Sequence, residues 1–402
     1  MSSNPENAQV TIGGHFVGQG TSIFRYALES EFRDQGADVT IHNLRDGSPI
    51  AMTTWMAIRE GYRVAPHNGL VRSALYSDGQ RRAGALTTSA NRGFFSGFTG
   101  DEKIVAVHGM YGIGRDRYLA GGDVYPETFV DGRTTSYVTL PQTRDLLNEK
   151  SSEKPKAIEV VGFMVPSQLR SEKRRADRQE KFALGEPTDD NPLRIAFMTT
   201  GQFNNMDYLH DTLMKDPLIT RWIKEGRAQL DIYLWNSLTH ALDTYSRAKI
   251  AGLKPVMREK YHPKFDEGHG VQIFSNPFRV KAIEGAVQMG YANDILFSIA
   301  AEKMPWFSEL PGIGLPIVAQ NNKMAMNTQW AQEMGLIGPD SELASPGEVI
   351  LDQLRSPQSR FRTQYERVAD GNTKVAQEVG NQNFELFSAA RQIPQRVLGA
   401  TR

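Results

Sequence analysis

The chain has 402 residues, and 46 basic side chains balance 46 acidic ones, so its formal charge is zero. This balance gives no reason to expect nucleic acid or another polyanion as a partner. Cysteine is absent, which excludes disulfides, thiolate metal sites and redox chemistry at sulfur. The length favours two domains. We expect a cytoplasmic protein, because residues 1–8 are polar and no apolar run approaches the roughly 20 residues of a membrane span.

The chain opens twice with the same pattern of strand, small-residue turn and helix. An expected strand at residues 10–12 leads into Gly13-Gly14-His15 and a helical run over 22–35. A second expected strand, at 193–198, leads into Thr200-Gly201-Gln202 and a helical segment beginning near residue 206. Such turns aim backbone N–H groups at an anion. Two copies a domain length apart predict two nucleotide-binding halves that face each other across a cleft.

Apolar runs of strand length alternate with helical periods along the whole chain. This alternation is typical of parallel sheets covered by helices. The remaining expected strands lie at residues 39–41, 104–108, 136–139 and 158–162 in the first half, and at 230–235, 271–274, 294–298 and 316–319 in the second. We therefore predict an α/β fold of two Rossmann-like domains, at residues 1–165 and 193–380.

The segment between these domains, residues 166–192, is basic and ends in turn-forming residues. Its basic side chains are Arg170, Lys173, Arg174, Arg175, Arg178 and Lys181. We expect a charged surface helix followed by a linker, with anion binding as the alternative.

The apolar spacing from residue 373 to 397 predicts an amphipathic helix. We expect residues 381–402 to form a C-terminal helix that crosses back to the first domain. A helix that only closes its own domain is the alternative.

Four segments occur in the order found in a known family. They are Gly13-Gly14-His15, the strand that ends at His108, residues 160–166, and the run from Asp294 through Ser308-Glu309 to Val318. In this order they resemble the two-domain GT-B glycosyltransferases. Within these the likeness is to family 28, which holds the lipid-linked N-acetylglucosaminyltransferase of cell-wall synthesis and the monogalactosyldiacylglycerol synthases.

The sequence departs from that family at two places in the second half. Residues 300–306 contain no glycine, whereas the family has a glycine turn shortly before the Ser-Glu pair. The Gln-Glu or Gln-Gln pair that reads the sugar is also missing, and only Asn327 is in place. The donor phosphates or sugar are then held differently, or not at all.

The resemblance places three candidates for a catalytic base on the acceptor side, namely His15, His108 and Asp123. A His or Asp near an acceptor hydroxyl is what general-base deprotonation requires. Each residue also has a structural interpretation. His15 caps a helix or packs beneath its loop, His108 satisfies a neighbouring carbonyl, and Asp123 lies in a surface turn.

On the donor side, Glu309 follows the strand at 294–298, and a carboxylate there can accept both ribose hydroxyls of a nucleotide. The alternative is a glutamate that stabilises a helix start. Thr200, Gly201 and Gln202 offer hydroxyl and N–H groups to a diphosphate, or form a simple turn. The other residues assigned to the donor site are Gly13, Gly14, Phe274 and Asn327.

Residues 55–76 interleave aromatic and aliphatic side chains with arginines. Such a stretch can lie on an anionic membrane surface, and core helices explain the spacing equally well. The eight histidines are scattered, so we expect no metal site, and we expect no cofactor.

These observations predict a glycosyltransferase that moves a sugar from a nucleotide-diphosphate donor, a UDP-sugar by preference, to a hydroxyl of a small-molecule or lipid acceptor. The resemblance implies inversion without a metal. Two other functions stay open. One is a nucleotide-sugar epimerase of the same architecture, which needs no acceptor. The other is a binding protein that kept the fold and lost the chemistry.

Overall fold

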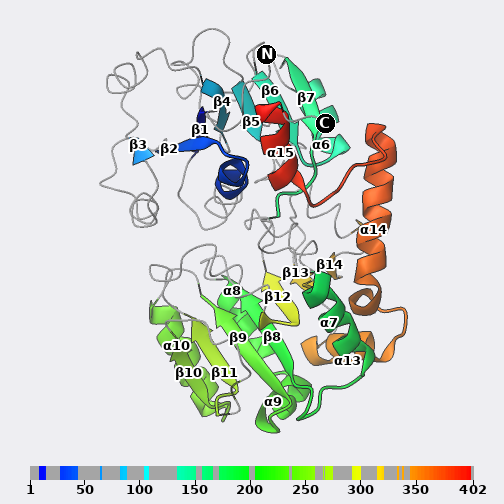
Figure 1. Ribbon diagram of the computed structural model, residues 1–402. Coiled ribbons are helices and arrows are strands. Elements are labelled where there is room, and N and C mark those ends of the chain that lie inside the picture. Colours follow the sequence, from blue (N-terminus) through cyan, green and yellow to red (C-terminus); the bar gives the residue numbers. More distant parts are fainter. Residues whose placement is uncertain are drawn as a thin grey trace. The chain divides into compact units, whose positions relative to one another are not determined.

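The computed structural model describes residues 9–14, 28–43, 64–65, 82–87, 104–107, 134–150, 156–165, 172–198, 204–234, 238–258, 266, 268–274, 292–299, 315–320, 333–334, 337–338 and 345–399. The chain forms two compact units. Unit 1 comprises residues 1–167 and 372–402, and unit 2 comprises residues 168–371. Each unit is built around a parallel β-sheet (Figure 1).

The sheet of unit 1 has the strand order β3-β2-β1-β4-β5-β6-β7, and its neighbouring strands are parallel. The chain order therefore reverses between β1 and β4. A helix over residues 28–34 follows β1, and α6 (Pro141–Lys150) joins β6 to β7. The strands are β1 (Gln9–Gly14), β2 (Asp38–Asn43), β3 (Val64–Ala65), β4 (Arg82–Thr87), β5 (Ile104–Val107), β6 (Thr134–Val138) and β7 (Ala157–Val160).

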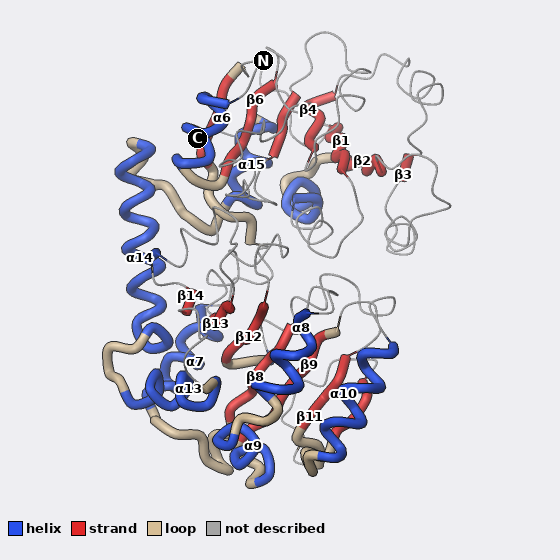
Figure 2. Tube along the Cα trace, turned by 180° about the vertical axis from the view of Figure 1, so that it is seen from behind, coloured by secondary structure: helices blue, strands red, loops and turns tan. Residues whose placement is uncertain are grey.

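The sheet of unit 2 has the order β10-β11-β9-β8-β12-β13-β14 and is also parallel (Figure 2). Its order reverses between β8 and β12. The strands are β8 (Leu193–Met198), β9 (Ala228–Tyr233), β10 (Pro255–Arg258), β11 (Val271–Phe274), β12 (Ile295–Ile299), β13 (Ile317–Gln320) and β14 (Ile337–Gly338). The helices are α7 (Glu172–Ala183), α8 (Asn204–Asp207) continuing into the π-helical turn η3 (Tyr208–Leu213), α9 (Pro217–Lys224), α10 (Leu238–Ile250), α13 (Pro346–Arg355) and most of α14 (Arg360–Val379).

The predicted α/β class with parallel sheets is confirmed, and each expected strand overlaps an observed one. The sequence analysis missed β3, β4, β10 and β14. Two of these, β3 and β14, are only two residues long. The edge strand β10 begins with Pro255, which lacks the N–H that an inner strand would need.

The core of unit 2 forms on the apolar faces of its strands and helices. Trp222, Phe197 and Phe297 are fully buried there. Asp216 begins α9, because its Oδ1 accepts the N–H groups of Leu218 and Ile219 at 2.9 and 3.0 Å. This cap fixes the start of α9, and Trp222 lies on the buried face of the helix with Ile219 and Ile223.

The helix expected over residues 373–397 is interrupted, so that prediction is wrong. α14 ends at Val379, directly before Gly380, whose φ of +67° is left-handed, and α15 (Ala389–Leu398) starts afterwards. Residues 372–379 of α14 and all of α15 belong to unit 1. There α15, red in Figure 1, lies against the sheet. A left-handed glycine commonly ends a helix, and here it ends α14 although the apolar spacing continues beyond it.

The segment before α15 docks on the residues that follow β7. The Leu386 carbonyl accepts the Phe163 N–H at 2.5 Å, and the rings of Phe163 and Phe387 stack with centroids 5.4 Å apart. Gly162 has a φ of +81° and lies directly under Leu386. The end of the chain is therefore an integral part of unit 1.

The basic segment forms α7, but this helix is not only a solvated surface. Arg178 is 1% exposed, and its Nε donates to the Asn293 carbonyl at 2.9 Å. Lys181 reaches a buried carboxylate of the sheet, as described below. The expectation of a charged surface helix is therefore wrong for these two side chains.

Candidate functional site

Ligands of open parallel sheets bind outside the carboxyl ends of the strands, where the strand order reverses. In unit 1 this point lies between β1 and β4, and β1 ends with Gly13 and Gly14. In unit 2 it lies between β8 and β12, where Met198 ends β8. Both glycine-containing turns of the sequence analysis thus begin at the reversal point of a sheet.

Phe274 ends β11 at the same carboxyl edge of unit 2. Its ring stacks on that of Tyr233, the last residue of β9, with centroids 4.8 Å apart and planes inclined by 9°. The two residues are partners in the parallel register, and Phe274 is buried. The stack holds the carboxyl ends of β9 and β11 together.

Of the predicted site residues, Gly13, Gly14 and Phe274 lie within the described parts of the chain. His15, His108, Asp123, Thr200, Gly201, Gln202, Glu309 and Asn327 lie outside the described residues. In the sequence, His15 directly follows the last residue of β1, His108 that of β5, and Thr200 comes two residues after β8. Their roles remain predictions.

A buried polar network crosses the sheet of unit 2, and the sequence analysis did not find it. Arg194 of β8 donates from Nη2 to Oδ2 of Asp231 on β9 at 2.6 Å, and Gln229 donates to Oδ1 at 2.7 Å. Asp294, just before β12, accepts Lys181 Nζ at 2.6 Å and the Arg194 N–H at 2.8 Å. The sequence contained a signal for this network, because the charged residues Arg194 and Asp231 lie within strands that are mostly apolar.

The network continues to the edge strand. Gln229 accepts the N–H of Asp266 at 2.9 Å, and Asp266 is paired with Arg258 of β10 and with His269. Burial raises the pKa of Asp231 against the opposing effect of Arg194. Burial alone would raise the pKa of Asp266 as well, but the Gly268 N–H, His269 and Arg258 together lower it. The network links strands β12, β8, β9 and β10 through side chains.

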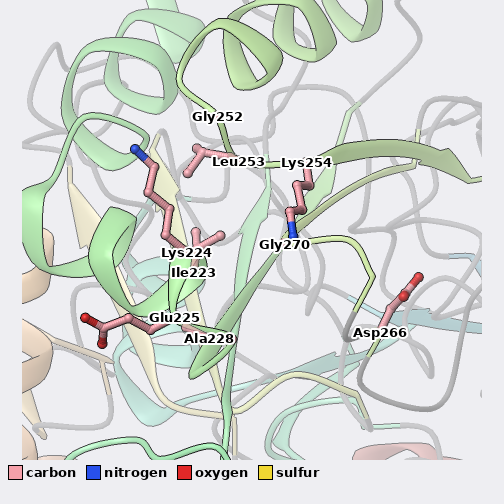
Figure 3. A pocket seen from close by; sticks show the side chains of 10 residues that line it. Ile223, Lys224, Glu225, Ala228, Gly252, Leu253, Lys254, Asp266 and Gly270 are labelled. Carbon is pink, nitrogen blue, oxygen red and sulfur yellow. The ribbon is translucent and has the colours of Figure 1, made fainter.

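A cavity of about 420 Å³ opens at the opposite edge of this sheet (Figure 3). It lies where α9 and α10 end and where β10 and β11 begin, and Lys224, Lys254 and Asp266 line it. The last carbonyls of two helices make this region negative, and the lysines offset that field. Because the cavity faces the amino ends of the strands, we do not assign the nucleotide site to it.

The parts of the chain that the structure describes hold no group of three or more His, Asp or Glu side chains suited to a metal ion. Within the same residues, no helix is long and apolar enough to cross a membrane.

No protein-family model and no curated protein matches the sequence. Several solved structures match the fold. One is the UDP-GlcNAc 2-epimerase of Neisseria meningitidis bound to UDP-GlcNAc, with 10% identity, 98% of this chain and 100% of that chain covered, and a TM-score of 0.52. A glycosyltransferase from Rickettsia africae has 12% identity, 98% and 100% coverage, and a TM-score of 0.51.

WaaG, a glycosyltransferase involved in lipopolysaccharide biosynthesis, matches with 11% identity, 97% and 100% coverage, and a TM-score of 0.50. These matches cover nearly the whole chain, so they establish the GT-B type of fold that the resemblance predicted. At such low identity they establish the fold alone.

Proposed function

We propose that the chain is a glycosyltransferase that takes a nucleotide-sugar donor, with residues 193–380 as the donor side and residues 1–165 as the acceptor side. One observation carries the proposal. The two strands that lead into the small-residue turns, β1 and β8, both lie where the strand order of their sheet reverses. Turns of this kind bind the phosphate-bearing part of nucleotides in parallel sheets.

Each predicted site residue has its own role in this proposal. Thr200, Gly201 and Gln202 bind the donor diphosphate. The Glu309 carboxylate accepts hydrogen bonds from the ribose hydroxyls. Phe274, held by Tyr233 at the end of β11, supports the nucleotide base, and Asn327 contacts the sugar. Gly13 and Gly14 let the backbone of the first turn approach the donor closely.

On the acceptor side, His15, His108 or Asp123 removes the proton of the attacking hydroxyl. The hydroxyl oxygen bonds to the anomeric carbon while the bond from that carbon to the diphosphate breaks. Oriented N–H groups stabilise the charge that develops on the leaving diphosphate. A single displacement of this kind inverts the anomeric centre, as the likeness to family 28 implies.

The acceptor is a small molecule or a lipid. The alternation of aromatic and basic residues over 55–76 supports a lipid acceptor reached at an anionic membrane surface. Co-sedimentation with anionic and with neutral vesicles tests this point, and equal recovery with both would remove the support for membrane contact.

Activity is tested by incubating the protein with UDP-glucose, UDP-galactose or UDP-GlcNAc and a panel of hydroxyl acceptors, and by following UDP release and product mass. We expect acceptor-dependent UDP release. Replacing the catalytic base should lower kcat by about 10²- to 10⁴-fold. Comparing the variants His15→Gln, His108→Gln and Asp123→Asn shows which of the three residues is the catalytic base. His269→Gln, which makes the same exchange at the amino edge of unit 2, is the matched control.

A second candidate function is epimerisation of a nucleotide sugar. The N. meningitidis epimerase bound to UDP-GlcNAc has the same fold at a TM-score of 0.52, which supports this alternative. Such an enzyme would convert UDP-GlcNAc to its epimer with no acceptor present, whereas a transferase would not. The same incubation without acceptor, followed by NMR of the sugar, separates the two.

A further inference from the structure

The cavity at the amino edge of the unit 2 sheet combines buried apolar residues with exposed lysines (Figure 3). Ile223, Ala228 and Leu253 line it and are buried, whereas Lys224 and Lys254 line it and are exposed. Its volume is about 420 Å³. Sites for small molecules typically have volumes of roughly 300–1,000 Å³ and an apolar lining with a few polar groups. The cavity therefore has the size and the lining of a binding site that the proposed function does not use.

The two carboxylates that line the cavity are already paired with arginines. Glu225 lies 2.9 Å from Nη1 of Arg227, and its side chain points away from Lys254 in Figure 3. Asp266 is paired with Arg258. Each carboxylate is thus neutralised by a cation other than the lining lysines.

The two lysines carry more positive charge than the neighbouring helix ends offset. α9 ends at Lys224, and α10 ends at Ile250. Each helix end carries about half a negative charge, so the two ends together offset about one of the two ammonium charges. Within the part of the chain that the structure describes, neither Lys224 nor Lys254 forms an ion pair. About one positive charge therefore remains at the cavity, which favours an anionic ligand.

The backbone of Lys254 gives a second, independent indication of a ligand site. Among the non-glycine residues that the structure describes, only Lys254 has a left-handed backbone, with a φ of +48°. Pro255 follows it, and a proline favours an extended conformation of the preceding residue. Strained residues of this kind are concentrated at ligand and active sites. A glycine would fit this turn without strain, so the lysine indicates that its side chain has a role at the cavity.

The Lys224 ammonium lies beside the turn that contains Lys254. A Cβ placed on Gly252 would be 3.9 Å from Lys224 Nζ, and Gly252 precedes Lys254 by two residues. The Lys224 side chain thus extends from the end of α9 to the turn that follows α10. Lysine side chains are flexible, so both ammonium groups can approach one anion at this turn.

We propose that this cavity binds a sugar phosphate, whose phosphate is held by Lys224 and Lys254. A phosphate carries up to two negative charges, which matches two ammonium groups, and lysine binds phosphate as a point charge. The Asp266 carboxylate and carbonyls at the helix ends can accept hydrogen bonds from sugar hydroxyls. The site lies at the amino edge of the sheet, opposite the proposed nucleotide site, and does not depend on it.

Isothermal titration of the full chain with glucose 6-phosphate tests the site, and inorganic phosphate and glucose are the comparison ligands. We expect glucose 6-phosphate to bind more tightly than inorganic phosphate, and glucose not to bind. Lys224→Met and Lys254→Gly should each raise the dissociation constant of glucose 6-phosphate about tenfold, because each removes a charged hydrogen-bond donor. Lys249→Met is the matched control and should bind like wild type, because Lys249 lies in the last turn of α10 but does not line the cavity.

Two further measurements separate this site from folding defects and from the nucleotide site. Lys254→Gly should unfold at a urea concentration at least as high as that of wild type, because glycine adopts a left-handed φ without strain. UDP should not displace glucose 6-phosphate. Absence of binding, displacement by UDP, equal affinity for inorganic phosphate, or equal weakening by Lys249→Met would each overturn the proposal. The proposed sugar transfer is tested separately by UDP release, so the failure of one proposal can be told apart from the failure of the other.

Discussion

Lys181 Nζ lies 2.6 Å from Oδ2 of Asp294, and this contact attaches α7 to the start of β12. The same oxygen accepts the Arg194 N–H at 2.8 Å, so one buried carboxylate holds a helix and a central strand. The segment that precedes α7 in the chain joins the two units. The contact therefore attaches α7 to the sheet of unit 2.

Replacing Asp294 with Ala should destabilise unit 2 by about 3 kcal/mol, because a partly buried cation and a buried N–H lose their acceptor together. Urea unfolding followed by tryptophan fluorescence, to which the buried Trp222 of unit 2 contributes, measures this change. Lys215→Met, which removes a lysine from the exposed pair with Asp211, should leave the midpoint of urea unfolding unchanged. If Asp294→Ala unfolds at the same urea concentration as the control, the contact contributes little to the stability of unit 2.

The pair of Arg194 and Asp231 should show opposite effects in single and double variants. Asp231→Leu leaves the guanidinium buried without its partner and should cost about 3–5 kcal/mol. Arg194→Met combined with Asp231→Leu removes both charges and should recover most of that loss, or exceed wild-type stability by about 1–4 kcal/mol. A double variant as unstable as the worse single variant would mean that the pair is needed for reasons other than charge balance.

Gly162 should tolerate no side chain. A Cβ at Gly162 would lie 2.2 Å from the Leu386 carbonyl oxygen, whereas a Cβ at Gly380 would meet nothing within 4 Å, and both glycines have positive φ. Gly380→Ala therefore measures the backbone strain, and Gly162→Ala should be worse by about 2–3 kcal/mol through the clash. We expect limited proteolysis to release residues 384–399 from Gly162→Ala first. Identical digestion of both variants would contradict this close approach.

Tyr137 should stay protonated well above its ordinary range. Burial and the charge of Glu159 raise its pKa to about 12, against the opposite effect of Arg396. A raised folded-state pKa gives stability that is present below pH 10 and is lost as the pH rises from 10 to about 12. The loss should reach about 3 kcal/mol.

Alkaline unfolding of wild type and Tyr137→Phe, measured at several pH values, tests this dependence. The advantage of wild type should shrink over that interval. A constant difference would show that Tyr137 ionises normally.

Periodicity and turn residues were enough to predict the class of fold and every inner strand except β4, since parallel strands are apolar on both faces. Strands without an apolar run were not predicted. One example is β10, which begins with Pro255 and ends with the charged Arg258. The end of the helix before Gly380 was not predicted, because the apolar spacing continues past this residue. The backbone of Gly380 is left-handed.

The buried polar network could not be predicted from spacing. Lys181 and Asp294 are 113 residues apart, and whether a lysine on a basic helix meets solvent or a buried carboxylate depends on tertiary packing. Phe274 was correctly expected in a strand, but its stack on Tyr233 depends on the insertion of β11 between β9 and β10. Local sequence does not encode that strand order.

Nucleotide binding tests the central claim most directly. Thermal unfolding should be followed with UDP, GDP, CDP and dTDP and with their common sugar conjugates, for wild type and Glu309→Ala. A ligand at 100 times its dissociation constant stabilises the native state by about 2.7 kcal/mol, enough to raise Tm by several degrees. We predict a clear rise with uridine nucleotides that Glu309→Ala loses. No rise with any nucleotide at millimolar concentration would contradict the donor site and favour a binding protein without this chemistry.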